Sequence, residues 1–218
     1  MIRALVFDFD GLFLDTESAL IDAYAGVHAD YGLPFDRALF QESVGHADYA
    51  FDPWHAFEKR ADRAALEVER QRRNREFNDR LPVLPGAVAL LDAGRDAGLR
   101  LGVASNSRHP HVEGQLKRLG LHARFEFFAC REDVPSPKPE PDLYKLVLNR
   151  FGLRGHEAIA FEDSQTGILA ATRAGLRAVA APGPATAHHD FSRADLRVAS
   201  LAGVNLPELL GRWAGAGG

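Results

Sequence analysis

The chain lacks three features, and each absence excludes a class of protein. It has a single cysteine, Cys130, so it can form neither an internal disulfide nor a cysteine metal cluster, as is typical of a cytoplasmic protein. No apolar run approaches the ~18 residues that cross a bilayer, and the N-terminus predicts no signal peptide. Positive charge is not in excess, because the net charge is −4. We therefore expect a cytoplasmic protein with no membrane or nucleic-acid partner.

Lysine is scarce as well, since only four of the 26 basic residues are lysines. A lysine inside a motif is therefore worth notice. The length of 218 residues and the hydrophobic content of 46% are enough for one large α/β domain, or for a core with a small insert. We expect a monomer or a weak homodimer.

Apolar strand-like segments alternate with helical patterns over most of the chain. The predicted strands are 2–7, 100–104, 125–129, 158–161, 178–181 and 196–199. The predicted helices are 87–97, 111–119, 142–151, 166–174 and 206–213. This alternation predicts an α/β fold with a doubly wound parallel sheet, and the continuous apolar strands indicate burial on both faces.

The stretch from residue 15 to residue 81 breaks the alternation, because it contains no convincing strand. Residues 17–31 and 60–80 have helical patterns, and the second is highly charged with mixed signs, as on a solvated face. Residues 51–55 are expected to separate helices of this insert, and the proline-rich segment 81–86 is typical of a return linker. We predict a core of residues 1–14 and 82–218, with a small helical cap of residues 15–81 inserted after the first strand.

Two aspartates, Asp8 and Asp10, end the first apolar strand and are followed by Gly11. A buried strand has no structural use for carboxylates at its end, because removing them from water is unfavourable. Ligands bind at the carboxyl ends of parallel strands. Paired acids beside a glycine turn therefore indicate a hard-metal site with a carboxylate nucleophile.

Three further segments follow predicted strands in a similar way. They are residues 103–107 (Val-Ala-Ser-Asn-Ser), 136–142 (Ser-Pro-Lys-Pro-Glu-Pro-Asp) and 160–167 (Ala-Phe-Glu-Asp-Ser-Gln-Thr-Gly). Together with the Asp-Phe-Asp-Gly segment at 8–11, they resemble the four motifs of the haloacid dehalogenase (HAD) superfamily, in order and over essentially the whole chain. The insert lies where the β-phosphoglucomutase-like subfamily carries a helical C1 cap. The resemblance implies a HAD-like Rossmannoid core that transfers phosphoryl groups.

The residue types at 8 and 10 fit phosphoryl transfer, which needs an in-line nucleophile and neutralisation of the phosphate oxygens. Asp8 would attack phosphorus and become an aspartyl phosphate, while Asp10 would protonate the leaving oxygen and then deprotonate water. Side chains two residues apart share a face of a strand, so both can face one phosphate. The alternative is that the two aspartates form a loop pair or cap a helix.

The resemblance also implies a Mg²⁺ site. Asp8 and Asp163 would each contribute a side-chain oxygen, and Asp10 its backbone carbonyl. Glu162 binds the metal directly in some members of the family and supports the ligands in others. Oxygen ligands of this kind suit Mg²⁺. The alternative for Asp163 is the N-cap of the helix that runs to residue 174.

Three residues are candidates for holding the transferring phosphate. The resemblance assigns this role to the Ser105 hydroxyl and the Asn106 amide, and a strand end before a helix supplies free N–H groups that attract anions. Lys138 lies between prolines that rigidify its loop, and its point charge suits a phosphate. The alternatives are a helix cap for Ser105 and a solvated surface position for Lys138.

The cap departs from β-phosphoglucomutase-like relatives where they bind a second phosphate. Leu20 stands at the position of a histidine, and residues 44–48 lack the lysine and the arginine of the mutase loop. These absences favour a simple phosphatase over a phosphosugar mutase. The cap residues expected to face the substrate are His46, Tyr49 and Trp54, together with Phe51, although the aromatic residues could instead form the core of the cap.

The predicted function is a Mg²⁺-dependent phosphatase that acts on a small phosphorylated metabolite, such as a sugar phosphate. A phosphosugar mutase of the β-phosphoglucomutase type is the first alternative. A 2-haloacid dehalogenase shares the fold but would need neither Asp10 nor a metal. A non-enzymatic HAD-like binding module should have lost part of the catalytic set, which is complete in this chain.

Overall fold

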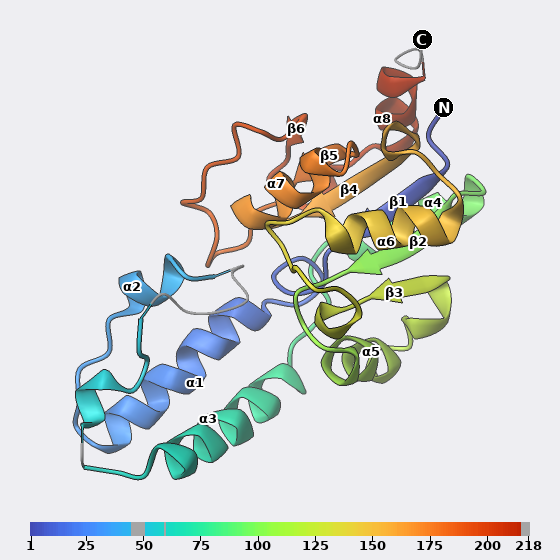
Figure 1. The fold of residues 1–218 in the computed structure, drawn as a ribbon. Coiled ribbons are helices and arrows are strands. Elements are labelled where there is room, and N and C mark those ends of the chain that lie inside the picture. The colour runs from blue at the N-terminus through green and yellow to red at the C-terminus, as the bar shows by residue number, and fades with distance from the viewer. Residues whose placement is uncertain (45–50, 59, 215–218) are drawn as a thin grey trace.

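The structure of the chain is a computed structural model that describes residues 1–44, 51–58 and 60–214. It contains a six-stranded parallel sheet with the order β3-β2-β1-β4-β5-β6 (Figure 1). The strands are β1 (Ala4–Phe7), β2 (Arg100–Ala104), β3 (Phe127–Ala129), β4 (Ala158–Glu162), β5 (Arg177–Ala180) and β6 (Leu196–Arg197). The predicted doubly wound α/β fold is confirmed, since the chain winds outwards from β1 to β3 and then from β4 to β6 on the other side.

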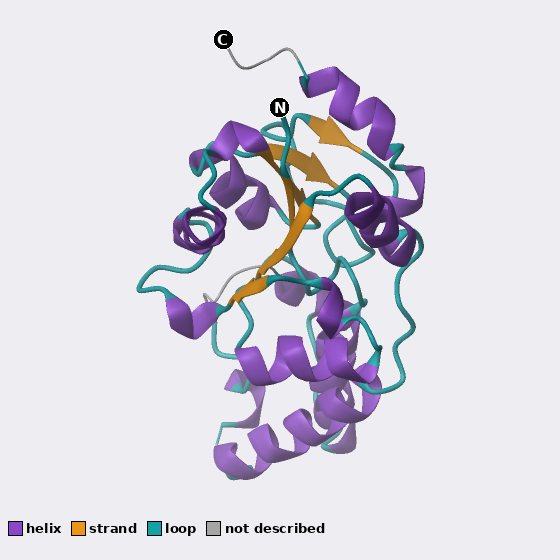
Figure 2. Ribbon diagram, turned by 90° about the vertical axis from the view of Figure 1, so that its right-hand side faces the viewer, coloured by secondary structure: helices purple, strands orange, loops and turns teal. Residues whose placement is uncertain are grey.

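Helices cover both faces of the sheet (Figure 2). They are α4 (Ala87–Asp96), α5 (His109–Arg118), α6 (Asp142–Phe151), α7 (Gln165–Arg173) and α8 (Leu206–Trp213). Successive side chains of a strand point to opposite faces. Leu5 and Phe7 pack with α4, α5 and α8, whereas Ala4 and Val6 pack with α6 and α7. All four residues are fully buried, which explains why the first strand is a continuous apolar run.

The part of the chain between β1 and α4 is helical. It contains α1 (Thr16–Asp30), α2 (Arg37–Gln41), a 3₁₀ turn (His55–Phe57) and α3 (Arg63–Asn78), and its described residues include no strand from position 15 to position 81. Each α-helix begins after an aspartate whose carboxylate accepts a hydrogen bond from the first turn: Asp15, Asp36 and Asp62. The last of these caps explains why the helix predicted over 60–80 begins only at Arg63.

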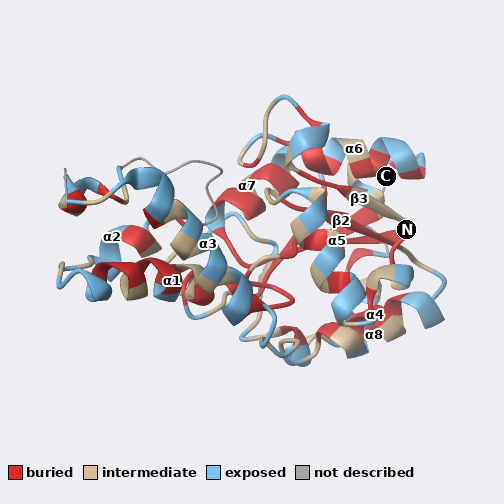
Figure 3. Cartoon of the chain, turned by 90° about the horizontal axis from the view of Figure 1, so that it is seen from below, coloured by how far each residue is buried: buried red, intermediate tan, exposed pale blue. Residues whose placement is uncertain are grey.

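These helices are joined by a hydrophobic cluster that is separate from the two clusters at the sheet. It comprises Ile21, Tyr24, Val27, Phe40, Val44, Trp54, Phe57 and Leu66, with Ala185 from the loop after β5. Figure 3 shows buried residues along α1, which packs against α3. The helices lie beyond the carboxyl ends of the strands (Figure 1), so they face the edge that carries the predicted motifs. No helix among the described residues is both long and apolar enough to cross a membrane.

Candidate active site

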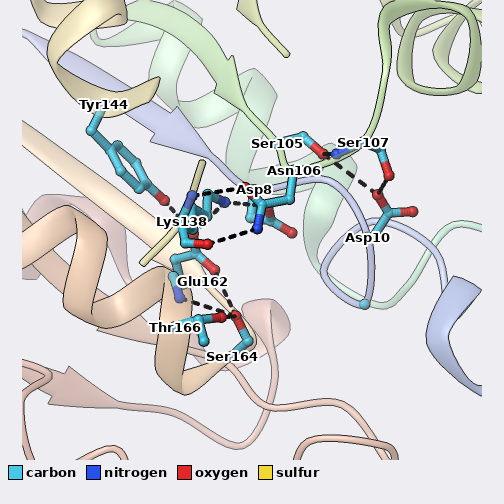
Figure 4. A network of polar contacts seen from close by, with 12 residues as sticks. Asp8, Asp10, Ser105, Asn106, Ser107, Lys138, Tyr144, Glu162, Ser164 and Thr166 are labelled. Carbon is cyan, nitrogen blue, oxygen red and sulfur yellow. Dashed lines mark hydrogen bonds and ion pairs between the residues drawn. The ribbon is translucent and has the colours of Figure 1, made fainter. Parts of the chain in front are cut away.

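The predicted site residues converge where the winding direction of the sheet changes. Asp8 follows β1, Ser105 follows β2 and Asp163 follows β4. Since β1 pairs in parallel with β2 on one side and with β4 on the other, the three residues lie at the same edge of the sheet. Doubly wound sheets bind their ligands at this switch point. Figure 4 shows the polar network that the site residues form.

Lys138 reaches this edge from the loop before α6 and is only 3% exposed. Its ammonium group donates hydrogen bonds to Asp8 Oδ1 and, at 2.6 Å, to Glu162 Oε1. Asn106 fixes the loop: its Oδ1 accepts from the Lys138 backbone N–H at 2.9 Å, and its Nδ2 donates to the Lys138 carbonyl at 3.2 Å. Burial lowers the pKa of Lys138, but the two carboxylates raise it above its usual value. Lys138 is therefore a buried, charged lysine and not a solvated surface residue.

Three acids, Asp8, Glu162 and Asp163, form a buried cluster in which one oxygen of each lies within 4.8 Å of the others. Burial raises the pKa of Asp8 and of Asp163 well above the usual range, and repulsion between neighbouring carboxylates adds to the rise. Lys138 opposes the rise at Asp8 but supplies one positive charge to three acids. An all-oxygen donor set that is short of positive charge fits a divalent cation such as Mg²⁺. The cluster could therefore hold a metal ion.

Two glycines make room for these acids. Gly11 has a φ of +73°, a left-handed conformation, and a Cβ at this position would overlap the Asp163 carboxylate. A Cβ at Gly167, in the first turn of α7, would overlap the carboxylate of Glu162. Tyr144 also donates a hydrogen bond to Glu162 (Figure 4). The close approach of the acids therefore depends on residues without a side chain at positions 11 and 167.

Asp10 lies to one side of the acidic cluster (Figure 4). Its carboxylate accepts hydrogen bonds from Thr16 Oγ1 at 2.8 Å and from Ser107 Oγ at 2.6 Å, and His111 Nε2 lies 2.8 Å from its Oδ1. Burial raises the pKa of Asp10, but His111 and the hydroxyl donors outweigh it and bring the pKa to about 2. Asp10 is therefore an ionised carboxylate, held by Thr16 of α1 and by His111 of α5.

Sequence reasoning misses His111, because no spacing relates it to Asp10, 101 residues earlier. The sequence signal that could have indicated His111 is its place in the first turn of the helix after Ser105, because that turn starts at the ligand-binding edge of the sheet. Thr16 and Ser107 are missed as partners of Asp10 as well, although each lies close to a motif.

The alternative roles of Ser105 and Asp163 as helix caps are wrong. The N-cap of α5 is Arg108, three residues after Ser105. The N-cap of α7 is Ser164, whose hydroxyl accepts a backbone hydrogen bond at 3.2 Å. The Ser105 hydroxyl instead accepts from the Ser107 N–H at 3.0 Å, within the loop itself. Neither predicted site residue is engaged in starting a helix.

A cavity of about 250 Å³ gathers most of the predicted core residues. Its core wall includes Asp8, Asp10, Ser105, Asn106, Lys138 and Asp163. The helical segment between β1 and α4 supplies the other wall, with Glu17, Leu20, Ile21, Phe40, Ser43 and Val44. The cavity is therefore charged on the side of the sheet, and on the other side it is apolar apart from Glu17 and Ser43 among the described residues.

Among the described residues, those predicted to face the substrate from the cap do not line the cavity, unlike most of the predicted core residues. His46 and Tyr49 lie outside the described residues. Trp54 is buried in the hydrophobic cluster of the cap, where its ring centroid lies 5.0 Å from that of Tyr24 and 5.7 Å from that of His28. It does not line the cavity at Asp8. This placement favours packing within the cap for Trp54 over contact with a substrate.

The comparisons with known proteins agree on one family. The chain matches the model of the haloacid dehalogenase-like hydrolases over residues 2–175. It is 36% identical over 214 residues to YhcW of Bacillus subtilis, which is named a phosphatase, with 96% of this chain and 97% of that protein covered. It is 30% identical over 226 residues to hexitol phosphatase B of Escherichia coli, again covering 96% and 97%. A mutant of CbbY from Rhodobacter sphaeroides, crystallised with xylulose 1,5-bisphosphate, has a TM-score of 0.76 at 28% identity, with 94% of this chain and 97% of that chain covered.

Proposed function

Because the chain belongs to the haloacid dehalogenase-like hydrolases, we propose that it is a phosphatase that acts on a small phosphorylated metabolite through an aspartyl-phosphate intermediate. The observation that carries the proposal is the meeting of Asp8, Lys138 and Asp163 at one edge of the sheet, with Asp10 held beside them. Relatives named as phosphatases, hexitol phosphatase B among them, support a sugar or polyol phosphate as the substrate.

Asp8 is the nucleophile of the proposed reaction. A bond forms between its carboxylate oxygen and phosphorus, while the bond from phosphorus to the substrate oxygen breaks and Asp10 gives a proton to that oxygen. Water then attacks the aspartyl phosphate, Asp10 takes a proton from the water, and inorganic phosphate leaves. Asp10 is ionised in the free site, as the second step requires. A bound phosphate raises the pKa of Asp10, because a nearby negative charge disfavours the ionised carboxylate. Substrate binding therefore favours the protonated Asp10 that the first step needs.

In this proposal the phosphate is held by Lys138, the Ser105 hydroxyl and the backbone amide N–H of Asn106. The proposed metal is Mg²⁺, held by the side chains of Asp8 and Asp163 and the backbone carbonyl of Asp10, with Glu162 beside them. When bound, it would neutralise the phosphate charge that repels an attacking carboxylate. The buried acids with their raised pKa values support this assignment, because they lack the positive charge that a cation would bring.

We assign residues 1–14 and 82–218 to a catalytic core and residues 15–81 to a cap that selects the substrate. The separate hydrophobic cluster of α1, α2 and α3 supports this division. We expect a monomer or a weak homodimer as the active form. The lone buried thiol at Cys130 fits the reducing cytoplasm.

The proposed function is tested by a hydrolysis screen. Phosphorylated sugars and polyols, with p-nitrophenyl phosphate as a generic substrate, are incubated with the chelator-treated enzyme, with and without added Mg²⁺. We expect release of inorganic phosphate that depends on Mg²⁺ and that at least one metabolite supports better than p-nitrophenyl phosphate. The absence of phosphate release from every compound, by an enzyme whose circular dichroism shows a folded chain, would refute the proposal.

A further inference from the structure

Thr186 brings a hydroxyl group to the acidic cluster from a loop that none of the four motifs includes. The loop comprises residues 181–190, directly after β5, and we call it the β5 loop. Thr186 Oγ1 donates a hydrogen bond to Asp163 Oδ2 at 3.2 Å, and the whole residue is buried. Asp163, a candidate metal ligand, is therefore also held from outside the motif to which it belongs.

The start of the β5 loop orients the Thr186 hydroxyl towards this carboxylate. The Gly183 backbone N–H donates to Thr186 Oγ1 at 3.1 Å, and the Thr186 N–H donates to the Gly183 carbonyl at 3.2 Å. Because an N–H already points at the hydroxyl oxygen, the single hydroxyl proton is available for an acceptor. Asp163 Oδ2 is closer to Thr186 Oγ1 than the Gly183 carbonyl, which lies 3.5 Å away. The turn from Gly183 to Thr186 therefore presents a donor to Asp163.

The same oxygen of Asp163 also packs against the loop that follows β1. A Cβ at Gly11 would overlap Asp163 Oδ2, so the carboxylate lies directly beside the Gly11 backbone. Contacts of one oxygen with both Thr186 and Gly11 limit the rotation of the carboxylate. A ligand whose orientation is fixed before an ion binds loses less conformational entropy when it binds.

Residues on either side of Asp163 hold the β5 loop in place. Before Asp163, the Glu162 carbonyl accepts a hydrogen bond from the Ala181 N–H at 2.7 Å. After Asp163, the Gln165 N–H donates to His189 Nδ1 at 3.3 Å. The two ends of the β5 loop are therefore fastened to β4 and to α7, the strand and the helix between which Asp163 lies.

The β5 loop also contacts the helices that cover the cavity. Ala185, the residue before Thr186, is 2% exposed and belongs to the hydrophobic cluster of α1, α2 and α3. Ile21 and Phe40 of that cluster line the cavity at Asp8. The loop is therefore packed between these helices and the acidic cluster, which keeps the Thr186 hydroxyl in one place.

We propose that Thr186 is a positioning residue for Asp163, and that its hydroxyl sets the affinity of the site for Mg²⁺. This proposal rests on the proposed function, which places the metal at Asp163. Hydrogen-bond partners behind a metal ligand orient that ligand, and removing such a partner typically lowers metal affinity by roughly 10–100-fold. Thr186 needs no contact with the metal or the substrate in this role, because it acts through Asp163.

The first test measures Mg²⁺ affinity in the absence of substrate. The free energy of urea unfolding is determined at increasing Mg²⁺ concentrations, and its rise gives the Kd of the folded protein. Thr186→Val replaces the hydroxyl with a methyl group of similar size and should raise this Kd by roughly tenfold or more. Thr186→Ser keeps the hydroxyl and should have a Kd close to that of the wild type. If Thr186→Val does not fold, Thr186→Ala gives the same comparison.

Thr172→Val is the matched control. The Thr172 hydroxyl donates at 2.9 Å to the Ile168 carbonyl within α7, so its removal should leave the Kd for Mg²⁺ unchanged. A purely structural role of Thr186 would lower the stability of Thr186→Val in EDTA without changing the Kd. The proposal would be overturned by an unchanged Kd in Thr186→Val, by an equal increase in Thr186→Ser or Thr172→Val, or by a wild-type chain that Mg²⁺ does not stabilise.

The second test measures the Mg²⁺ dependence of turnover with p-nitrophenyl phosphate. Thr186→Val should need roughly tenfold more Mg²⁺ than the wild type for its half-maximal rate, and excess Mg²⁺ should restore most of kcat. A loss of kcat that excess Mg²⁺ does not restore would overturn the positioning role. If the wild type released no phosphate from any compound while the Kd for Mg²⁺ still depended on the Thr186 hydroxyl, the phosphatase function would be wrong and the positioning role would stand.

Discussion

His111 Nε2 lies 2.8 Å from Asp10 Oδ1, so a core helix fixes the carboxylate that is proposed to move the proton. The same carboxylate accepts a hydrogen bond from Thr16, the first residue of the cap helix α1. His111 also lines two cavities that adjoin the one at Asp8. One imidazole therefore contacts the proposed acid and borders the space next to it.

The substitution His111→Phe should lower kcat by about tenfold, because a hydrogen bond to a charged group contributes ~1.5–3 kcal/mol and the donors Thr16 and Ser107 remain. The measurement is kcat and KM with p-nitrophenyl phosphate, whose leaving group is small. His122→Phe is the matched control, because that ring is on the same side of the sheet but contacts Glu113 instead of a site residue. A wild-type kcat for His111→Phe would show that the two hydroxyls alone position Asp10.

The substitution Asp8→Asn should abolish turnover and leave the fold intact. The amide is nearly isosteric with the carboxylate but cannot attack phosphorus. Initial rates with p-nitrophenyl phosphate and thermal unfolding measure the two effects. The exposed Asp96→Asn on α4 serves as the control and should behave like the wild-type enzyme. Activity of Asp8→Asn within tenfold of the wild type would refute the covalent mechanism.

Mg²⁺ should stabilise the chain, and Asp163→Asn should remove most of that effect. A ligand that binds only the folded state, at 100 times its Kd, adds about 2.7 kcal/mol to the free energy of unfolding. Denaturant unfolding with EDTA and with excess Mg²⁺ measures this difference without an activity assay. Ca²⁺ should inhibit turnover, because its bonds to oxygen are about 2.3–2.6 Å long against about 2.0–2.1 Å for Mg²⁺. Full activity after exhaustive chelation would remove the metal assignment.

The central strands of the sheet could be predicted from the sequence, because β1, β2, β4 and β5 are almost wholly buried and are therefore rich in apolar residues. The ends of strands are set by partners far away in the chain. Ile2 belongs to the first apolar run, but β1 begins only at Ala4, because the register pairs Ala4 with Arg100 and Ala158, the first residues of β2 and β4. No local pattern contains that information.

The core of the site was also predictable, since each motif follows a strand and the strand order brings the ends together. The cavity between α3 and the core was not predictable. The charged pattern of residues 60–80 indicates a solvated face, and Arg72 is exposed as predicted. Arg75 lines this cavity only because the end of α3 lies close to α5, and this tertiary contact leaves no spacing in the sequence.

Glu17 should make the folded state less stable as the pH rises from about 5 to above 8. Burial, together with the neighbouring Asp10 and Asp15 carboxylates, raises the pKa of this half-buried residue to about 8. Between its unfolded and folded pKa values the folded state binds more protons, so increasing pH favours unfolding, and the loss is complete only above the folded pKa. Glu17→Gln should lack this loss and should gain stability relative to the wild type on going from pH 5 to pH 8.5.

The measurement for Glu17 is urea unfolding of both proteins at pH 5, 6.5, 8 and 8.5, in EDTA so that metal binding does not contribute. Glu208→Gln, an exposed substitution at the start of α8, is the control and should run parallel to the wild type over this range. If the free energies of unfolding of Glu17→Gln and of the wild type change with pH in the same way, Glu17 is ionised in the folded enzyme at neutral pH.

Water, and not a sugar hydroxyl, should take the phosphate from Asp8. Among the described residues, those that the helical segment between β1 and α4 contributes to the cavity wall include Glu17 and the apolar Leu20, Ile21 and Val44, and none of them carries a positive charge that would hold a phosphorylated intermediate over the nucleophile. We therefore expect inorganic phosphate to be released without a requirement for a bisphosphate activator.

This last prediction is tested with β-glucose 1-phosphate and a trace of glucose 1,6-bisphosphate, by measuring glucose 6-phosphate and free phosphate together. Free phosphate should be formed in far larger amount than glucose 6-phosphate. Efficient isomerisation with little phosphate release would show that the enzyme is a mutase and that hydrolysis is a side reaction.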